Sequence, residues 1–515
     1  MSHSEAAERI ELAVFESRLA ALCETMGAVL RRSAFSPNIR DRLDFSCALF
    51  DADGELLNQA THIPVHLGSM AWAMRDLVDR FDWQPGDRLV LNDPYAGGTH
   101  LPDVTLIAPV FHDGRMTGFV ANRAHHADIG SETPGSMPLS RTLHDEGLLI
   151  EPTWLYRDGT RNEDAFRAIC APMRDPALAA ADFQAQVAAS ASGERALAAL
   201  IEEYGPARFR ALCAGLNGYA ERLAANALAA LPGGTYRAED AMDDDGAGGP
   251  GPVLRVAVEV DDGRVRVDFT GTDPAVPGNL NCPMSVTAAG VFYVVRCLLP
   301  DSTPACAGAM AGLTLEAPPG CLVHAQRPSA TAAGNVETSQ RIVDVLLRAL
   351  ARAIPERIPA ASQGTMNNLG LGSARWSYYE TQAGGCGASV DHPGRSAVHS
   401  HMTNTLNTPA EVLERHFPLR LVEYRIRRGS GGNGRQRGGD GLVRTFEFLE
   451  PAEVTLITER RRLAPWGLQG GEPGRPGENT LDGRPLAPKV GVKVGAGQRL
   501  RIATPGGGGY GAPPS

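Results

Sequence analysis

The chain has 515 residues, 43% hydrophobic and 21% charged, a composition typical of a soluble globular protein of about three domains. Its formal net charge is −10 and it contains no basic block, which argues against a nucleic-acid-binding surface. Lys489 and Lys493 are the only lysines and no GxxxxGK[ST] loop occurs, so neither a P-loop nucleotide site nor a Schiff-base lysine is expected.

The first 160 residues predict an N-terminal α+β domain. Apolar residues at helical spacing predict a helix over 5–33, which should end before Pro37 because the residue preceding a proline disfavours the helical region. A strand–turn–strand pattern follows, with its turn at Asp51–Gly54. A second helix is expected from Leu67 to Arg80, and strands should dominate from there to residue 122.

Three further parts are predicted in the rest of the chain. Residues 161–245 form a helical, alanine-rich segment, 246–429 a central α+β domain, and 430–515 a glycine-rich β part. The central part contains two expected helices, over 286–299 and 339–353. Because helical blocks and antiparallel hairpins are segregated along the chain, the predicted fold class is multi-domain α+β with antiparallel hairpins and mixed sheets.

Cysteine usage and the N-terminal sequence suggest a compartment. The nine cysteines are odd in number and form no CxxC pair, so neither a disulfide framework nor a zinc finger is expected. The opening MSHSEAAERIEL is polar and acidic, unlike a signal peptide, and no apolar run reaches the roughly 18 residues of a membrane span. We expect a cytoplasmic protein without a membrane partner.

The most informative segment is Asn92–Asp128, which predicts a β-hairpin. Apolar runs over 104–111 and 116–121 flank Asp113-Gly114, and an Asp-Gly pair between apolar stretches is a strong hairpin signal. Pairing of the two runs brings the residues at the open end of the hairpin together.

That open end carries His100, Asp103, His125 and His126. Imidazoles and a carboxylate that converge in a loop are suited to a divalent cation with coordination positions left open. The alternative is a set of side chains that cap and hydrogen-bond loops without a metal. We favour the metal, because two adjacent histidines opposite an H-x-x-D sequence are an improbable accident.

The turn length decides which histidine faces the carboxylate. A two-residue turn puts His126 on the face of Asp103, whereas a three-residue turn puts His125 there, and a slip of one residue exchanges the faces. Both histidines remain candidates. Arg123 and Asp128 flank the site; the aspartate could orient an imidazole, and a surface salt bridge is an equal alternative.

The sequence NIRDRLDFS supplies further charged candidates in Asp41, Arg42 and Asp44. One carboxylate could reach the metal or substrate, and Asp44 is the better candidate because it enters the strand. The alternative is a helix-to-strand connection held by an ion pair.

The sequence GNVETSQR places Asn335 and Glu337 just before an apolar helix. Thr338 and Ser339 could cap that helix, and a helix N-terminus can also hold an anion. Capping alone is the favoured interpretation.

Two later clusters are weaker candidates. His392, His399, His401 and Asn404 form a possible second ligand set, although such spacing is common by chance. The arginine- and glycine-rich segment Arg425–Gly441 could cradle a phosphate or carboxylate. We favour a structural loop at a subunit contact, because a lone glycine-rich loop is a weak signal.

Seven segments in this order resemble the B-type subunit of the hydantoinase/oxoprolinase family, over about residues 11–511. They are SPNIRDRLDFSCALFD, HIPVHLGSM, NDPYAGGTHLPDVTLIAPVF, RAHHADIG, VDFTGTD, NVETSQR and RGSGGNGRQRGGDGLVR. The family includes ATP-dependent N-methylhydantoinases, 5-oxoprolinases, caprolactamases, and acetone and acetophenone carboxylases.

The resemblance implies a separate A-type partner subunit that binds ATP and Mg²⁺ and phosphorylates the oxygen of the substrate, so a hetero-oligomer is expected. It also implies that His100, Asp103 and His125, with His126 as the alternative to His125, hold a divalent metal in this chain. Mn or Zn is the first expectation, with Fe or Co possible. Asp44, Arg123 and Asp128 are the candidate catalytic residues near it.

Three functions compete. The first is the metal-site subunit of an ATP-dependent hydrolase of a hydantoin, 5-oxoproline or another lactam, and the second is a subunit of a ketone carboxylase. The third is a non-catalytic subunit whose metal serves folding only. The motifs do not separate the first two, and the hydrolase is favoured because that branch of the family is broader.

Overall fold

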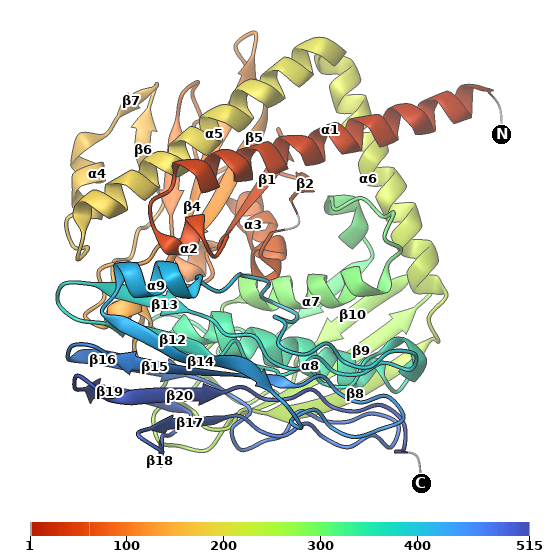
Figure 1. The fold of residues 1–515 in the computed structure, drawn as a ribbon. Coiled ribbons are helices and arrows are strands. Elements are labelled where there is room, and N and C mark those ends of the chain that lie inside the picture. The colour runs from red at the N-terminus through yellow and green to blue at the C-terminus, as the bar shows by residue number, and fades with distance from the viewer. Residues whose placement is uncertain (1–2, 61, 514–515) are drawn as a thin grey trace.

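The computed structural model describes residues 3–60 and 62–513 and has the predicted α+β architecture. Four sheets are present among these residues, and only the pairing of β10 with β11 is parallel. In Figure 1 the N-terminal sheet and its helices form one half of the molecule and the C-terminal sheets the other, with α7 and α8 between them.

The N-terminal half is built on a seven-stranded antiparallel sheet with the strand order β2-β1-β5-β4-β3-β6-β7. The strands are β1 (Phe45–Asp51), β2 (Leu56–Gln59), β3 (Arg88–Leu91), β4 (Asp103–His112), β5 (Arg115–His125), β6 (Thr153–Arg157) and β7 (Thr160–Arg161). The long hairpin β4–β5 lies at the centre of this sheet, so both of its strands are buried along most of their length.

Different helices cover the two faces of this sheet. Cys47 and Leu49 pack with α1 (His3–Ser33), while Ala48 and Phe50 pack with α3 (Pro64–Leu77). This alternation follows from the two-residue side-chain period of a strand. The remaining helices of this half are α2 (Pro37–Arg40), α4 (Glu163–Cys170), α5 (Pro176–Tyr204), which lies on the α1 face, and α6 (Pro206–Ala229).

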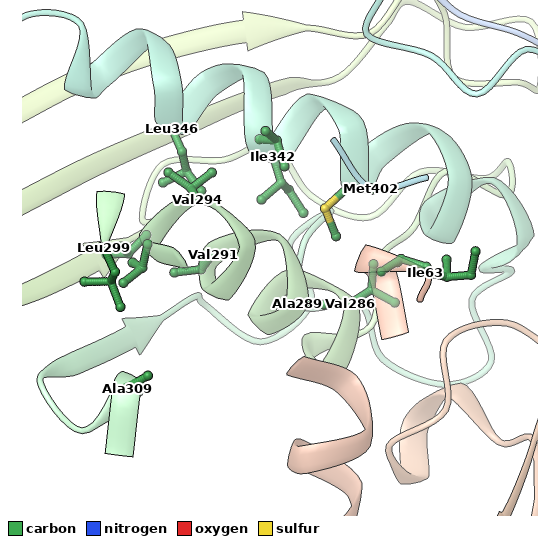
Figure 2. Packing of buried hydrophobic residues seen from close by; sticks show 14 of the residues in the cluster. Ile63, Val286, Ala289, Val291, Val294, Leu299, Ala309, Ile342, Leu346 and Met402 are labelled. Carbon is green, nitrogen blue, oxygen red and sulfur yellow. The ribbon is translucent and has the colours of Figure 1, made fainter. Parts of the chain in front are cut away.

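Two helices connect the halves. The helix α7 (Met284–Leu298) packs between α3 and α8 (Ser339–Leu350), and α8 lies on the second sheet. That sheet has the order β11-β10-β9-β8, from β8 (Gly234–Ala241), β9 (Val253–Asp261), β10 (Arg264–Asp268) and β11 (Leu313–Glu316). Figure 2 shows Val286 and Ala289 of α7 next to Ile63 and Met402, which come from two separate loops.

The C-terminal half contains two antiparallel sheets that share one apolar core, which includes Leu371, Phe446, Leu456 and Ile502. One has the order β13-β12-β16-β19, from β12 (Asn368–Gly372), β13 (Ser377–Glu380), β16 (Ala452–Ile457) and β19 (Lys489–Val494). The other has the order β14-β15-β20-β17-β18, from β14 (Leu419–Arg427), β15 (Gly441–Phe448), β17 (Glu478–Leu481), β18 (Arg484–Pro485) and β20 (Arg499–Ala503). The short helix α9 (Ala410–His416) precedes β14.

Four glycine-rich segments outside these sheets pack backbone against backbone, over residues 384–388, 430–439, 466–474 and 505–511. Hydrogen bonds run between them, for example from Gly432 N to Gly507 O and from Gly439 N to Cys386 O, both 2.9 Å. A Cβ on Gly507 would lie 2.0 Å from the Cys386 carbonyl oxygen, which is too close for any side chain. Their glycines are therefore required by the close approach of neighbouring chains.

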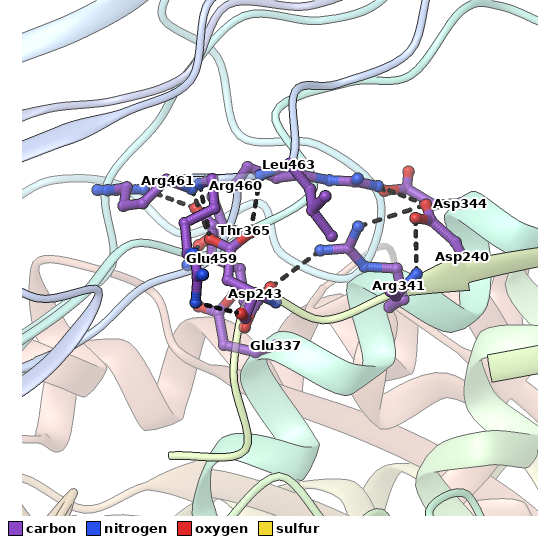
Figure 3. Close-up of polar contacts among 12 residues, drawn as sticks. Asp240, Asp243, Glu337, Arg341, Asp344, Thr365, Glu459, Arg460, Arg461 and Leu463 are labelled. Carbon is purple, nitrogen blue, oxygen red and sulfur yellow. Dashed lines mark hydrogen bonds and ion pairs between the residues drawn. The ribbon is translucent and has the colours of Figure 1, made fainter. Parts of the chain in front are cut away.

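A buried ionic network joins the central and C-terminal parts of the chain (Figure 3). Arg341 of α8 contacts Asp240 of β8 at 3.3 Å and Glu459 at 3.1 Å, and Arg460 contacts Asp240 at 2.7 Å. Lys489 completes it with a 2.5 Å contact to Glu459. Because all these side chains are nearly inaccessible, loss of one partner would leave an uncompensated charge in the interior.

Most of the predicted elements are confirmed, including α1, the β4–β5 hairpin, and the helices in 163–229, 284–298 and 339–350. The second helix begins at Pro64 rather than Leu67, because a proline is well suited to the first turn of a helix. Among the described residues, no helix combines the length and hydropathy needed to cross a membrane. The domain boundaries stay a prediction.

Candidate metal centre

The register of the β4–β5 hairpin determines which histidine faces Asp103. The two-residue turn at Asp113-Gly114 is present, with His112 opposite Arg115, and by itself it would place Asp103 opposite Ala124. A β-bulge on β5 between the Phe111–Met116 and Val110–Gly118 pairs shifts the register by one residue. Asp103 therefore lies opposite His125, on the face of the sheet that α3 covers.

His126 lies on the other face of the sheet. Its Nε2 is 2.9 Å from Oε1 of Gln186 on α5, and its ring packs on Phe183 with centroids 4.4 Å apart. The sheet thus separates His126 from Asp103. Of the two histidines that the sequence left open, His125 is the one placed beside the carboxylate.

A third histidine joins the cluster from α3. His66 Nε2 is 3.3 Å from Asp103 Oδ2, and His100 Nε2 is 3.2 Å from the same oxygen. The rings of His100 and His125 have centroids 5.1 Å apart. Sequence reasoning did not select His66, although its segment HIPVHLGSM was among those that carry the family resemblance.

The chemistry of these four side chains suits a divalent ion, and two of their separations are compatible with one. Donor atoms about 2.1 Å from one tetrahedral ion are separated by roughly 3–3.5 Å, the range of the two histidine–carboxylate distances. Asp103 Oδ1, His125 Nε2 and His100 Nδ1 are buried without a hydrogen-bond partner in the described part of the chain, and His100 Nε2 approaches Asp103 Oδ2 without hydrogen-bond geometry. Buried polar atoms are rarely left unpaired, so this set is suited to an ion.

The donor side chains lie beside a small cavity and are not arranged as a complete set of metal ligands. Within residues 3–60 and 62–513, no three His, Cys, Asp or Glu side chains are assembled in metal-site geometry. The cavity beside them has a free volume of about 20 Å³ and is lined by His66, Asp103 and His125 together with Asp44 and Asn335. This volume admits one water or ion but no cyclic substrate.

His125 is held in one orientation. Its ring stacks on Tyr379 with centroids 4.8 Å apart and an interplanar angle of 2°. Its Nδ1 is 3.0 Å from the carbonyl oxygen of His126 and 3.1 Å from Nδ2 of Asn38. With the proton on Nδ1 donated to the His126 carbonyl, the Asn38 amide does not donate to that nitrogen, and the lone pair of Nε2 is available on the other side of the ring.

The electrostatics at His125 and Asp103 favour the protonation states that a metal site needs. Burial lowers the pKa of His125 well below its ordinary value, so the imidazole is neutral. Burial raises the pKa of the Asp103 carboxyl, but His100 and His66 outweigh this effect and hold it well below its usual range. A neutral imidazole and an ionised carboxylate are the forms that coordinate divalent ions.

Asp44 and Arg42 lie beside the cluster. Asp44 lines the cavity, and burial raises the pKa of its carboxyl. Arg42 donates to the Tyr379 carbonyl at 2.8 Å, and its guanidinium lies 3.5 Å from Asp44 Oδ2. Asp41 pairs instead with Arg40 at 3.1 Å.

Arg123 and Asp128 have different surroundings from Asp44. Arg123 is fully buried near the cluster, donating to the Thr105 hydroxyl at 2.8 Å and the Gly97 carbonyl at 3.0 Å, and burial lowers its pKa to about 10. Asp128 is outside the cavity lining: it accepts hydrogen bonds from the Ser136 hydroxyl and the Arg174 backbone. The structure thus brings Asp44 to the cluster but not Asp128.

The favoured capping interpretation of GNVETSQR is wrong. Residues Gly334–Thr338 form a π-helix that runs directly into α8, and Thr338 makes no capping hydrogen bond. Because the chain is already helical there, the first amides of α8 need no cap. Asn335 instead lines the cavity, with Nδ2 3.4 Å from Asp103 Oδ2.

Glu337, in the same π-helix, is fully buried and accepts hydrogen bonds from Thr365 and Asn368. Burial raises the pKa of its carboxyl to about 8. A raised carboxyl pKa stabilises the folded state below the unfolded value, and this contribution is lost as pH rises through 8. We therefore expect Glu337→Gln to gain stability relative to the native chain between pH 5 and pH 8, measured by urea unfolding; a pH-independent difference would contradict this.

The two weaker clusters do not assemble into sites. His392 is exposed, His401 Nδ1 is 3.4 Å from the Tyr293 hydroxyl, and Asn404 donates to the His62 carbonyl. In the 425–441 segment the backbone amides of residues 430 and 431 both donate to Asp440 Oδ1 at 2.9 Å. The chain's own carboxylate therefore occupies the place where a phosphate or carboxylate ligand could have bound. The structural interpretation of this loop accounts for its glycines.

The fold and this cluster define an α+β protein with a buried, histidine-rich candidate metal centre at one end of a β-hairpin. Comparison with known proteins then gives its family. The model of the Hydantoinase B/oxoprolinase family matches residues 8–513, so the chain belongs to this family.

Individual relatives agree with that assignment. The chain is 39% identical over 540 residues to 5-oxoprolinase 1 of Arabidopsis thaliana, covering 98% of this chain and 42% of that protein. It is 31% identical to the B-type subunit of a putative D-/L-hydantoinase from a Pseudomonas species, covering 95% of this chain and 87% of that protein. The solved ATP-dependent caprolactamase of Pseudomonas jessenii has a TM-score of 0.90 at 27% identity, covering 98% and 91% of the two chains.

The chain spans about two fifths of the length of the 5-oxoprolinases that it matches. The hydantoinase subunit, in contrast, is nearly matched in length. The same sequence unit thus occurs both within long chains and as a subunit.

Proposed function

We propose that this chain is the metal-site subunit of an ATP-dependent hydrolase of a cyclic amide, with 5-oxoproline the leading substrate. The observation that carries the proposal is the convergence of His66 and His100 on Asp103, with His125 beside them, in a buried cluster where Asp103 Oδ1 and His125 Nε2 have no hydrogen-bond partner in the described part of the chain. The relatives named 5-oxoprolinase, at 35–39% identity, favour 5-oxoproline over other lactams.

In this proposal the chain prepares the site and a partner supplies the activated substrate. The partner is an A-type subunit that binds ATP with Mg²⁺ and phosphorylates the amide oxygen, which gives the ring carbon a leaving group that a plain amide lacks. Support comes from the relative that is named as one subunit of a hydantoinase and from the absence of a GxxxxGK[ST] loop in this sequence.

The residues would act as follows. His66, His100 and His125 offer nitrogen donors and Asp103 an oxygen donor, a set suited to Mn²⁺ or Zn²⁺ and also open to Fe²⁺ or Co²⁺. A bound divalent ion would lower the pKa of a water on it to about 7 and so supply a nucleophile near neutrality. Tyr379 fixes the His125 ring, Asn335 orients the Asp103 carboxylate, and the buried lining excludes bulk water.

Metal analysis together with His100→Ala tests this function. We expect the purified chain to contain about one divalent ion, and the complex with its ATPase partner to release ADP only when 5-oxoproline or a related lactam is present. His100→Ala should remove the ion and the turnover but leave the complex folded, because a catalytic site tolerates loss of its metal better than a structural one.

Two results would contradict the proposal. Unfolding of the His100→Ala variant together with unchanged turnover per folded complex would assign the metal to folding only. ADP release that depends on a ketone and bicarbonate, and not on a lactam, would assign the chain to a carboxylase. His112→Ala, on the exposed turn of the same hairpin, is the matched control and should change neither metal content nor turnover.

A further inference from the structure

A second and larger cavity lies behind the segment that carries His66. Its free volume is about 340 Å³, and it is enclosed by β2, α3, α7 and the segment 305–310. Ala71, Phe292 and Met310 are among its predominantly apolar walls. This volume is at the low end of the range of ligand-binding pockets and suits a small cyclic molecule.

The two cavities share a wall made of two chain segments. His62 and Pro64 face the large cavity, whereas Ile63, Val65 and His66 face the small one. On the second segment, Asn404 faces the large cavity, and its neighbours at 402, 403 and 405 face the small one. Figure 2 shows Ile63 and Met402 side by side next to α7.

Two hydrogen bonds join these two segments. Val65 N donates to Met402 O at 3.2 Å, and Asn404 Nδ2 donates to His62 O at 2.9 Å. The candidate ligand His66 is therefore separated from the large cavity by a single layer of chain. A molecule held there is adjacent to the candidate metal centre.

Two polar atoms in the lining of the large cavity lack partners. Gln59 Oε1 and Arg296 Nη1 are buried, and neither has a hydrogen-bond partner in the described part of the chain. The charged residues of the lining are Glu55, Arg75 and Arg296, and neither arginine forms an ion pair with a described residue. An acceptor and a net positive charge in an apolar cavity favour a ligand with one donor and one negative charge.

We propose that this cavity binds a small cyclic amide bearing a carboxylate. The amide N–H would donate to Gln59 Oε1, the carboxylate would accept from Arg296, and the ring would pack against Phe292 and Ala71. This inference rests on the proposed function and adds where such a substrate is held and which residues, Gln59 and Arg296, recognise its amide and its carboxylate.

Binding of three probes tests the proposal: 5-oxoproline, 2-pyrrolidinone without the carboxylate, and cyclopentanecarboxylate without the amide. We expect 5-oxoproline to bind the 515-residue chain most tightly in calorimetric titrations. Arg296→Gln should weaken the binding of 5-oxoproline about 10- to 100-fold, because it removes one charge-assisted hydrogen bond. The affinity for 2-pyrrolidinone should stay unchanged. Gln59→Leu should weaken the binding of both lactams but not the binding of cyclopentanecarboxylate.

Arg357→Gln is the matched control, since Arg357 donates to the Leu298 carbonyl at the end of α7 and lies outside the lining. Equal 5-oxoproline affinity in the native chain, Arg296→Gln and Arg357→Gln would overturn the proposal. If 5-oxoproline does not bind the chain alone, its KM in the complex with the ATPase partner is the readout, and equal KM values for the three proteins overturn it as well.

The outcome is independent of the test of the metal centre. Turnover that requires His100 together with an unaffected Arg296→Gln variant would reject this cavity and keep the proposed function. If Arg296→Gln selectively loses 5-oxoproline binding but turnover does not depend on the metal, the cavity remains a binding site. The proposed hydrolase function would then be rejected.

Discussion

His125→Ala is expected to abolish metal binding and to lower lactam-dependent ADP release by more than about 100-fold, beyond the effect of losing a residue that only orients a ligand. The reason is the position of Nε2, which is buried, unpartnered and on the Asp103 side of the sheet. Metal content of the purified protein and turnover with the ATPase partner are the measurements.

His126→Gln is the control for this prediction because it changes the adjacent residue on the opposite face. A glutamine can keep a hydrogen bond to Gln186, so metal content and turnover should stay within about twofold of the native values, a difference below about 0.5 kcal/mol. If His126→Gln lost the metal and His125→Ala retained it, the bulge on β5 and the hairpin register would both be misassigned.

Gly507→Ala is expected to lower the free energy of unfolding by about 3 kcal/mol or more, at the upper end of the cost of overpacking. The added Cβ would lie 2.0 Å from the Cys386 carbonyl oxygen and 2.7 Å from Gly387 N, and both are backbone atoms that cannot rotate away. Relieving that contact would separate two of the packed glycine-rich segments. Urea unfolding of the purified chain measures the change.

Gly491→Ala is the matched control, because a Cβ at that position meets nothing within 4 Å and its backbone does not adopt a positive φ. It should be neutral or slightly stabilising, since alanine restricts the unfolded chain more than glycine does. Equal losses in the two variants would show that the glycine-rich segments tolerate side chains and that their glycines have another role.

Local patterns predicted most of the elements. The helical spacing in 5–33 and the Asp-Gly turn of the β4–β5 hairpin are signals that tertiary packing did not override, because both elements bury the faces their patterns define. The π-helix at Gly334–Thr338 left no such signal, and it is the reason the capping interpretation of that segment was wrong. Residues 430–515 were predicted as a glycine-rich β part, and they contain strands β15 to β20 but also long stretches outside any strand.

Some residues of the candidate site could be identified from the sequence, and others could not. His100 and Asp103 could be chosen from the sequence because they are three residues apart at the start of a strand, and the histidine pair because it ends the returning strand. His66 could not, because it reaches Asp103 only through the packing of α3 on the sheet. Tyr379 likewise lies far along the chain, and only the docking of the C-terminal half brings its ring onto His125.

The sequence by itself determined the hairpin, the donor types at its open end and the family of the chain, because these depend on neighbours in sequence and on motifs. Only the tertiary structure decided between His125 and His126, because one unpaired residue in β5 reverses which face each side chain occupies. Only it revealed the cavity behind His66, because walls from four separate elements enclose that space.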